Sequence, residues 1–304
     1  MKEGSTVAEL PKAKPPANPV GRTLAMNGPE TIREFVLRRP TFFRHWDGVK
    51  VSAAYLLNRD RSFLEAEGRW CSRQGLHVMI DFTDLLNGFP DMRLLSRDEI
   101  EAKRTWTMLE DILAKAPLLG VRECILALHP TCANGQLVLL ADNRADMEAT
   151  YCKMTKRIAD AGLTAHLRMS PLRLTGKFSQ VDEWIAKAEP GTIKPTVSLA
   201  AVMAIDGLTP AQRDAAIRSR KGGLCLLASA PRDVNGTCWS YSAPLAEAAD
   251  VVRSSLAAVA ASGARVVFDA AYPDPDAEYR DAKLIEGMAQ NSLDKANAPK
   301  KQAR

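Results

Sequence analysis

The feature that most constrains this chain is a regular alternation of short apolar runs with longer amphipathic stretches. Each run has the length of a buried strand, and the runs tend to end in polar residues or proline. Strands that are apolar along most of their length are typical of parallel sheets covered on both faces. Seven such runs cover residues 49–55, 76–82, 123–128, 163–168, 193–199, 223–228 and 265–269.

Helix signals separate these runs. Ser62 with Glu65, and Ser96 with Glu99, have the spacing of a capping box at the start of a helix. Apolar stripes at helical spacing and end signals predict further helices over 147–158 before Gly162, over 245–259 before Gly263, and from Thr209-Pro210 to Gly222.

Strands that alternate with helices predict repeated βαβ units and a parallel sheet. A weaker strand at 23–26, followed by a helix at 30–38, brings the strand number to eight, which matches a (β/α)8 TIM barrel over residues 22–288. An open doubly wound sheet is the competing fold, but the chain has no Gly-rich nucleotide motif of the G-x-G-x-x-G or G-x-x-x-x-G-K-[ST] type.

The net charge of +5 comes from the two ends of the chain. Without residues 1–22 and 291–304, 33 basic and 33 acidic residues remain. A neutral body argues against a nucleic-acid partner, which requires a basic surface stripe. We expect the Pro-, Ala- and Lys-rich tails, residues 1–21 and 289–304, to be disordered.

Nothing in the sequence resembles a membrane span or an apolar signal core, so we expect no membrane partner and a cytoplasmic location. The six cysteines form no C-x-x-C pair. Several lie inside apolar runs, as Cys124 and Cys225 do, and we interpret them as small core residues rather than as disulfide partners.

In a barrel, reactive groups lie after the carboxyl ends of the strands. Asp81 and Asp269 are carboxylates at two such ends. Glycosidases use a pair of carboxylates, but with no Glu at any strand end, Asp81 with Asp269 is a weak indication of that activity. His129 and His166 lie near the ends of two central strands and could act as a general base or metal ligand. His166 could equally be a core residue. Other polar residues at strand ends, each of which could also be ordinary loop polarity, are Asn58, Arg59, Thr83, Asp84, Asn87, Thr131, Arg168, Ser170, Ser198, Ser229, Arg232, Asp233 and Tyr272.

Several segments resemble the xylose-isomerase-like barrels of the sugar-phosphate isomerase/epimerase superfamily. They are residues 58–65, 81–91, 197–207, 226–233, 269–272 and 276–281. The resemblance implies a divalent cation held by Glu, Asp, His and Glu from four successive strand ends, which polarises a sugar carbonyl while carboxylates move a proton.

The chain departs from that ligand pattern. Arg168 or Met169 stands where the resemblance places the first Glu, residues 199–202 replace the Asp segment, and the His strand ends in Ala228-Ser229. Asp269 alone keeps a carboxylate. We therefore expect no inherited metal site and no other cofactor, while a divalent metal held in another way stays open.

Three hypotheses follow. The first is an isomerase-, epimerase- or lyase-like protein that acts on a sugar or sugar acid, with Asp81 or Asp269 as base and His129 as acid. Its expected partner is a carbohydrate or anionic ligand, and the residues expected to bind it are Asn87, Arg168, Arg232 and Asp233, with the two arginines as anion clamps. The second is an inactive barrel that serves as a binding or scaffold subunit, with a protein partner or in a homo-oligomer. A nucleic-acid enzyme, known among proteins of this fold, is disfavoured by the neutral body.

Overall fold

The computed structural model describes most of the chain between Arg22 and Leu284. The described residues are 22–26, 28–40, 43, 47–82, 99–127, 132–133, 136–137, 144–169, 177–205, 208–220, 223–228, 243–262, 264–270, 272, 276–281 and 283–284. Both predicted disordered tails lie outside them.

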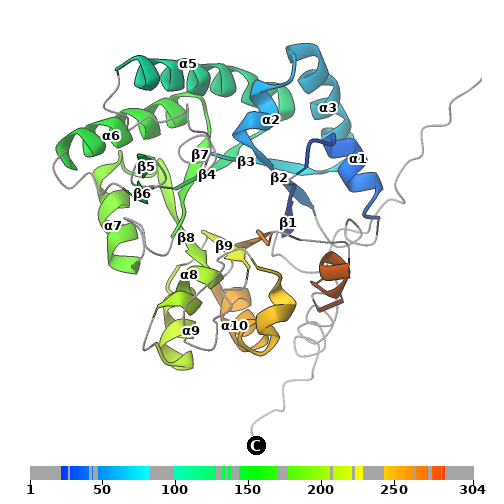
Figure 1. The fold of residues 1–304 in the computed structure, drawn as a ribbon, viewed down its shortest axis with the longest axis vertical. Coiled ribbons are helices and arrows are strands. Elements are labelled where there is room, and N and C mark those ends of the chain that lie inside the picture. The colour runs from blue at the N-terminus through cyan, green and yellow to red at the C-terminus, as the bar shows by residue number, and fades with distance from the viewer. Residues whose placement is uncertain are drawn as a thin grey trace, which may run out of the picture.

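Eight parallel strands close into a barrel in the order β1-β10-β9-β8-β7-β4-β3-β2, with β2 paired to β1. The helices surround the ring of strands (Figure 1). This confirms the predicted (β/α)8 fold, including the weak first strand. The barrel strands are β1 (Arg22–Ala25), β2 (Gly48–Ser52), β3 (His77–Asp81), β4 (Glu123–Leu126), β7 (Thr164–Leu167), β8 (Ile193–Ser198), β9 (Leu224–Leu227) and β10 (Arg265–Phe268).

The helices of the described residues connect successive strands. They are α1 (Ile32–Leu37), α2 (Ala53–Leu57), α3 (Arg61–Gln74), α5 (Glu99–Lys115), η2 (Ala116–Leu119), α6 (Arg144–Asp160), α7 (Phe178–Lys187), α8 (Leu199–Ala204), α9 (Pro210–Arg218), η4 (Leu245–Ala248) and α10 (Ala249–Ser262). A short antiparallel pair, β5 (Cys132–Ala133) and β6 (Gln136–Leu137), lies between β4 and α6.

Two sequence predictions near β2 are wrong in their boundaries. The strand expected at 49–55 ends at Ser52, whose hydroxyl accepts a hydrogen bond from the amide of Tyr55 and so begins α2. The apolar run continues through this junction because α2 also packs against the core. Asn58 is therefore the residue after α2, not a strand end. The next helix, α3, begins after Asp60 and not at a Ser62 capping box.

The end signals of α6 and α9 have different outcomes. Thr209 caps α9 as predicted, in a capping box with Gln212. That helix ends at Arg218, before the Gly222 that was expected to stop it. Gly162 follows α6 with φ of 76°, a left-handed conformation that favours glycine. The predicted Ser96–Glu99 box begins in a segment outside the described residues.

The barrel interior is layered, as the strand register shows. Its central layer is apolar and consists of one cluster, which includes Met79, Ile125 and Val267. Charged residues lie inside the barrel on both sides of this layer. Glu123 is at the amino end of β4, whereas Asp81 is at the carboxyl end of β3. The apolar layer therefore separates two distinct polar clusters.

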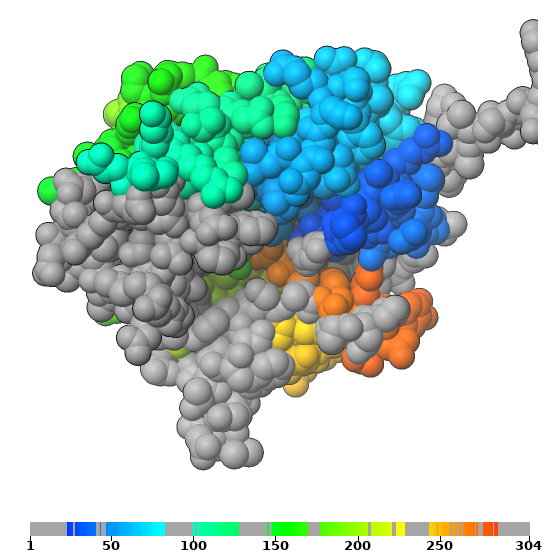
Figure 2. Space-filling view, turned by 45° about the horizontal axis from the view of Figure 1, so that its top comes forward, coloured from blue at the N-terminus to red at the C-terminus, as the bar shows by residue number. Residues whose placement is uncertain are grey.

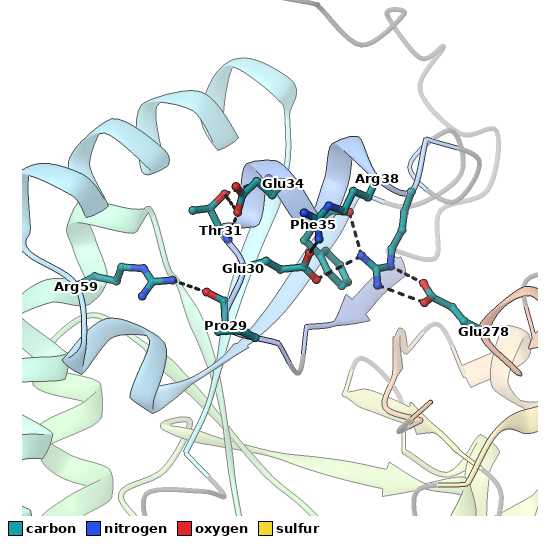
Figure 3. Close-up of polar contacts among 9 residues, drawn as sticks. Pro29, Glu30, Thr31, Glu34, Phe35, Arg38, Arg59 and Glu278 are labelled. Atoms are coloured by element: carbon teal, nitrogen blue, oxygen red, sulfur yellow. Dashed lines mark hydrogen bonds and ion pairs between the residues drawn. The ribbon is translucent and has the colours of Figure 1, made fainter. Parts of the chain in front are cut away.

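The segment 276–281 fastens the last barrel unit to the first. Both carboxylate oxygens of Asp281 accept backbone hydrogen bonds at the start of η4, from Leu245 (2.7 Å) and Ala246 (2.8 Å). Glu278 forms an ion pair with Arg39, just beyond α1. Figure 2 shows this orange segment against the blue N-terminal unit, and Figure 3 shows Glu278 beside α1.

Two further findings concern burial. Of the six cysteines, Cys71, Cys124 and Cys225 are buried and carry free thiols, which confirms their place in the core. Among the helices of the described residues, we find none that is long and apolar enough to cross a membrane.

Candidate functional site at the carboxyl ends of the strands

Four charged side chains meet at the carboxyl ends of the barrel strands. Lys50 comes from β2 and Asp81 is the last residue of β3. Arg168 follows β7, and Asp269 follows β10. We call these four residues the mouth cluster.

The ammonium group of Lys50 joins the two carboxylates. Its Nζ lies 2.6 Å from Oδ2 of Asp81 and donates a second hydrogen bond to Oδ1 of Asp269. The guanidinium of Arg168 contacts the same carboxylates, with Nη2 2.7 Å from Oδ2 of Asp269 and Nη1 3.9 Å from Oδ2 of Asp81. Two cations and two anions therefore form one neutral cluster.

All four side chains are largely removed from water. The exposed fraction is 8% for Lys50 and Asp81, 5% for Asp269 and 15% for Arg168. Burial lowers the pKa of Lys50, but the charges of Asp269 and Asp81 outweigh this effect, so the pKa lies above its ordinary value. Lys50 is therefore a permanent cation at neutral pH.

The pleat of β2 explains why Lys50 points into the barrel. Side chains of a strand alternate between its two faces. Val49 and Val51 are fully buried on the face that packs against the helices, which leaves Lys50 on the inner face. There Lys50 lies in register with Met79, a residue of the central apolar layer.

Asp269 has an acceptor that is not fully used. Oδ2 of Asp269 lies 2.7 Å from Nη2 of Arg168 as an ion pair, and it receives no hydrogen bond from the residues that the structure describes. A buried carboxylate oxygen of this kind costs free energy unless a donor reaches it.

The structure brings together three of the seven residues proposed from the sequence, Asp81, Arg168 and Asp269. The other four lie outside the described residues, and their roles stay predictions: His129, Asn87, Arg232 and Asp233. Sequence reasoning missed Lys50. The available signal was a charged residue between two valines in a strand expected to be covered on both faces.

The other candidates among the described residues have structural contacts. Arg59 lies over the rings of Tyr55 and Phe63 and donates to the carbonyl of Pro29 at 2.9 Å (Figure 3). Ser198 caps α8 by accepting from the amide of Ala201.

His166 belongs to a second cluster, which surrounds Glu123 at the amino end of β4. It is only 1% exposed, and its Nε2 lies 3.2 Å from Oε1 of Glu123. The other oxygen of Glu123 lies 2.8 Å from Nε2 of His77 and 2.8 Å from Nη1 of Arg265. His166 therefore takes the predicted alternative of a partnered core residue, on the far side of the apolar layer from the mouth cluster.

The contacts of this second cluster shift two pKa values. Burial raises the pKa of Glu123, but its hydrogen bonds with His166 and His77 and the charge of Arg265 outweigh burial, so the pKa lies well below its usual range. Burial lowers the pKa of His166 more than Glu123 raises it. Glu123 is therefore ionised at neutral pH, and His166 is neutral.

Comparison with known proteins finds the same barrel fold in solved structures of xylose-isomerase-like TIM barrels and sugar epimerases. The D-psicose 3-epimerase of Clostridium cellulolyticum H10, solved with D-tagatose, is 12% identical, with a TM-score of 0.60 over 90% of this chain and 97% of its own. The 3-keto-D-glucoside 4-epimerase of E. coli is 13% identical, with a TM-score of 0.62 over 89% and 99%.

A third similar structure is a xylose-isomerase-like barrel protein from Mycobacterium smegmatis in complex with magnesium. It is 12% identical, with a TM-score of 0.60 over 90% of this chain and 98% of its own. No family model and no curated protein matches the sequence. At these identities the likeness establishes the shared fold.

The mouth cluster does not fit a divalent cation such as magnesium. Hard cations need several oxygen ligands, usually carboxylates with free lone pairs. Here Lys50 and Arg168 already contact both carboxylates, and alanines follow two of the neighbouring strands, Ala127 after β4 and Ala228 after β9. No group of three or more His, Cys, Asp or Glu within the described part of the chain could hold a metal ion.

Proposed function

We propose that the protein binds a sugar or sugar acid at the mouth cluster and removes a proton from a carbon atom next to a carbonyl, the step that isomerases, epimerases and lyases of such compounds share. One observation carries this proposal. Two buried carboxylates, Asp81 and Asp269, face each other across the cationic groups of Lys50 and Arg168 at the end of the barrel where TIM-barrel enzymes bind their ligands.

The arrangement contains the two components that such a proton transfer needs. A carboxylate must accept a proton from carbon, and a cationic donor must stabilise the negative oxygen that forms. Oδ2 of Asp269 lies beside the guanidinium of Arg168 but receives no hydrogen bond from the described residues, so we assign the base to Asp269. Lys50 and Arg168 supply the donors for the developing oxygen charge.

The class of substrate is supported by the similar structures. Several of them are sugar epimerases by their titles, which name D-psicose, a 3-keto-D-glucoside and L-ribulose. Arg168 would in addition bind a carboxylate or phosphate of the ligand, since its planar group can contact two oxygens at once. The predicted roles of His129 as acid and of Asn87, Arg232 and Asp233 in ligand binding belong to this same proposal.

A ligand screen tests the proposal. We expect the melting temperature of the protein to rise with some members of a panel of ketoses, sugar acids and sugar phosphates, because a ligand that binds the native state stabilises it. For an anionic ligand, the double variant Arg168→Ala/Arg232→Ala should lose this rise while it remains folded. A control, Arg253→Ala on the exposed face of α10, should keep it.

A scaffold role is the outcome opposed to this proposal. The neutral mouth cluster, in which each charge lies beside an opposite charge, would serve a purely structural barrel equally well. Absence of stabilisation by every sugar compound, together with a stable complex between the protein and a partner in a pull-down, would reject the enzyme proposal and support the scaffold.

A further inference from the structure

We infer that Lys50 and Arg168 take the place of a divalent cation in this barrel, so that the site polarises its ligand with fixed side-chain charge and requires no metal. This inference rests on the proposed function for the location of the ligand. It concerns a property that the fold comparison does not supply, because the similar barrel from Mycobacterium smegmatis is described as a magnesium complex.

Lys50 occupies the position of a bridging group in the barrel. Its ammonium group lies between carboxylates of two strands, β3 and β10, which are separated in the barrel by β2 and β1. A bridge of this kind is what a metal ion provides when it joins ligands from different strands. The bridging atom is here covalently attached to β2, so its position is fixed by the fold.

The charges of the mouth cluster disfavour a bound metal ion. The carboxylates of Asp81 and Asp269 bring two negative charges, and Lys50 with Arg168 brings two positive charges. A divalent cation added beside them would meet two positive groups at short range in a region from which water is largely excluded. Such repulsion is much stronger there than in water. The cluster therefore favours the metal-free state.

Lys50 has hydrogen-bond donors for both the carboxylates and the ligand. An ammonium group has three donors, and Lys50 uses two of them on Asp269 and Asp81. Among the described residues we find no acceptor for the third N–H, which could therefore reach a carbonyl or alkoxide oxygen of the ligand. Lys50 thus combines two tasks that a metal performs in other sites, because it holds the carboxylates together and stabilises negative charge on the substrate.

A metal titration tests the inference without a known substrate. Wild-type protein treated with EDTA should keep its melting temperature, and added MnCl₂, MgCl₂ or ZnCl₂ should not raise it. In Lys50→Ala, Asp81 and Asp269 lose one of their two cations and keep only Arg168, so the cluster has a net negative charge that favours a metal ion. We expect MnCl₂ at about a hundredfold excess over Kd to raise the melting temperature of this variant by about 5 °C, and EDTA to reverse the rise.

Lys187→Ala is the matched control. Lys187 also lies between two carboxylates, with Nζ 2.9 Å from Glu148 and 3.8 Å from Glu183, but on the outer surface of the barrel. Its removal should create no comparable response to manganese, because water competes well for exposed carboxylates. A response of equal size in both variants would contradict a specific role of Lys50.

The wild-type titration remains decisive even if Lys50→Ala does not fold. Stoichiometric manganese binding to wild type that is abolished by Asp81→Asn or Asp269→Asn would overturn the inference and leave a sugar-binding function intact. If wild-type protein responds neither to metals nor to any sugar compound, the inference that the mouth cluster excludes a metal stands. The proposed function is then rejected. The two failures are therefore distinguishable.

Discussion

Single buried charges decide the stability of this barrel at the residue scale. Glu123, at the amino end of β4, contacts His77, His166 and Arg265, three groups from three other strands, and its side chain is 19% exposed. Removal of its charge leaves these partners without their acceptor, which costs more than the lost attraction alone. The cluster thus couples β3, β4, β7 and β10 through one carboxylate.

Replacing this carboxylate should destabilise the fold. Glu123→Gln is expected to lower the free energy of unfolding by about 3 kcal/mol, measured by urea denaturation. Glu110→Gln is the control, because Glu110 forms an exposed ion pair with Arg157 and should cost about 0.5 kcal/mol or less. Equal effects of the two changes would show that the contacts of Glu123 contribute no more to stability than an exposed ion pair does.

Acid should weaken the fold through His166. Its pKa in the folded protein is below the ordinary value because of burial, whereas the unfolded chain titrates near the usual value of about 6.5. The unfolded state therefore binds more protons, and stability falls as the pH decreases below about 6.5. Urea denaturation from pH 7.5 to pH 5 should show this loss, and His166→Gln should reduce the slope. An unchanged slope in the variant would assign the pH dependence to other groups.

At the scale of elements, close packing at glycine joins α3 to η2. A Cβ added to Gly68 would lie 2.2 Å from the carbonyl oxygen of Leu118 and 3.0 Å from Cα of Leu119. Both are backbone atoms, which cannot move aside cheaply. Helix propensity alone would favour alanine over glycine in the middle of α3 by about 1 kcal/mol, so packing and propensity oppose each other here.

We expect packing to prevail at Gly68. Gly68→Ala should lower the free energy of unfolding by about 1–3 kcal/mol, because α3 and η2 must separate. Ser72→Ala, at an exposed position of the same helix, should change stability by about 0.5 kcal/mol or less. A stabilised Gly68→Ala variant would show that the two helices shift apart at little cost.

The elements also show what the sequence could and could not predict. The length of the apolar runs and their spacing along the sequence identify the eight strands, because a strand of a parallel barrel is short and apolar on both faces. They fail at residues 53–57, where α2 continues the apolar run without a polar interruption. Lys50 was missed because one charge inside an apolar run does not change its period. Its partners on β3 and β10 are adjacent only after the barrel closes.

On the scale of the whole molecule, the barrel is closed by pairing of β1 with β10 and secured by the segment 276–281. Burial raises the pKa of Asp281, although the amides of Leu245 and Ala246 and the hydroxyl of Tyr272 act against this shift. The carboxyl group of Asp281 satisfies the start of η4, which leads into α10. The segment is thus part of the last barrel unit and also contacts the first through Glu278.

Loss of the Asp281 contacts should destabilise the whole barrel. Asp281→Ala leaves the buried amide of Leu245 and the half-buried amide of Ala246 without their acceptor and is expected to cost about 2–3 kcal/mol in the free energy of unfolding. The exposed neighbour Asp276 provides the control, since Asp276→Ala should change stability by about 0.5 kcal/mol or less. Near-neutral behaviour of Asp281→Ala would mean that other contacts hold η4 in place.

According to the proposed function, the mouth cluster removes a proton from a carbon atom next to a carbonyl of its ligand. The most direct test is incubation of the EDTA-treated protein in deuterium oxide with each sugar compound that stabilises it, followed by NMR of the compound. We expect deuterium at that carbon with wild type and a rate of exchange at least about 100-fold lower with Asp269→Asn. No deuterium uptake from any bound compound, or an equal rate in the variant, would contradict the proposed function.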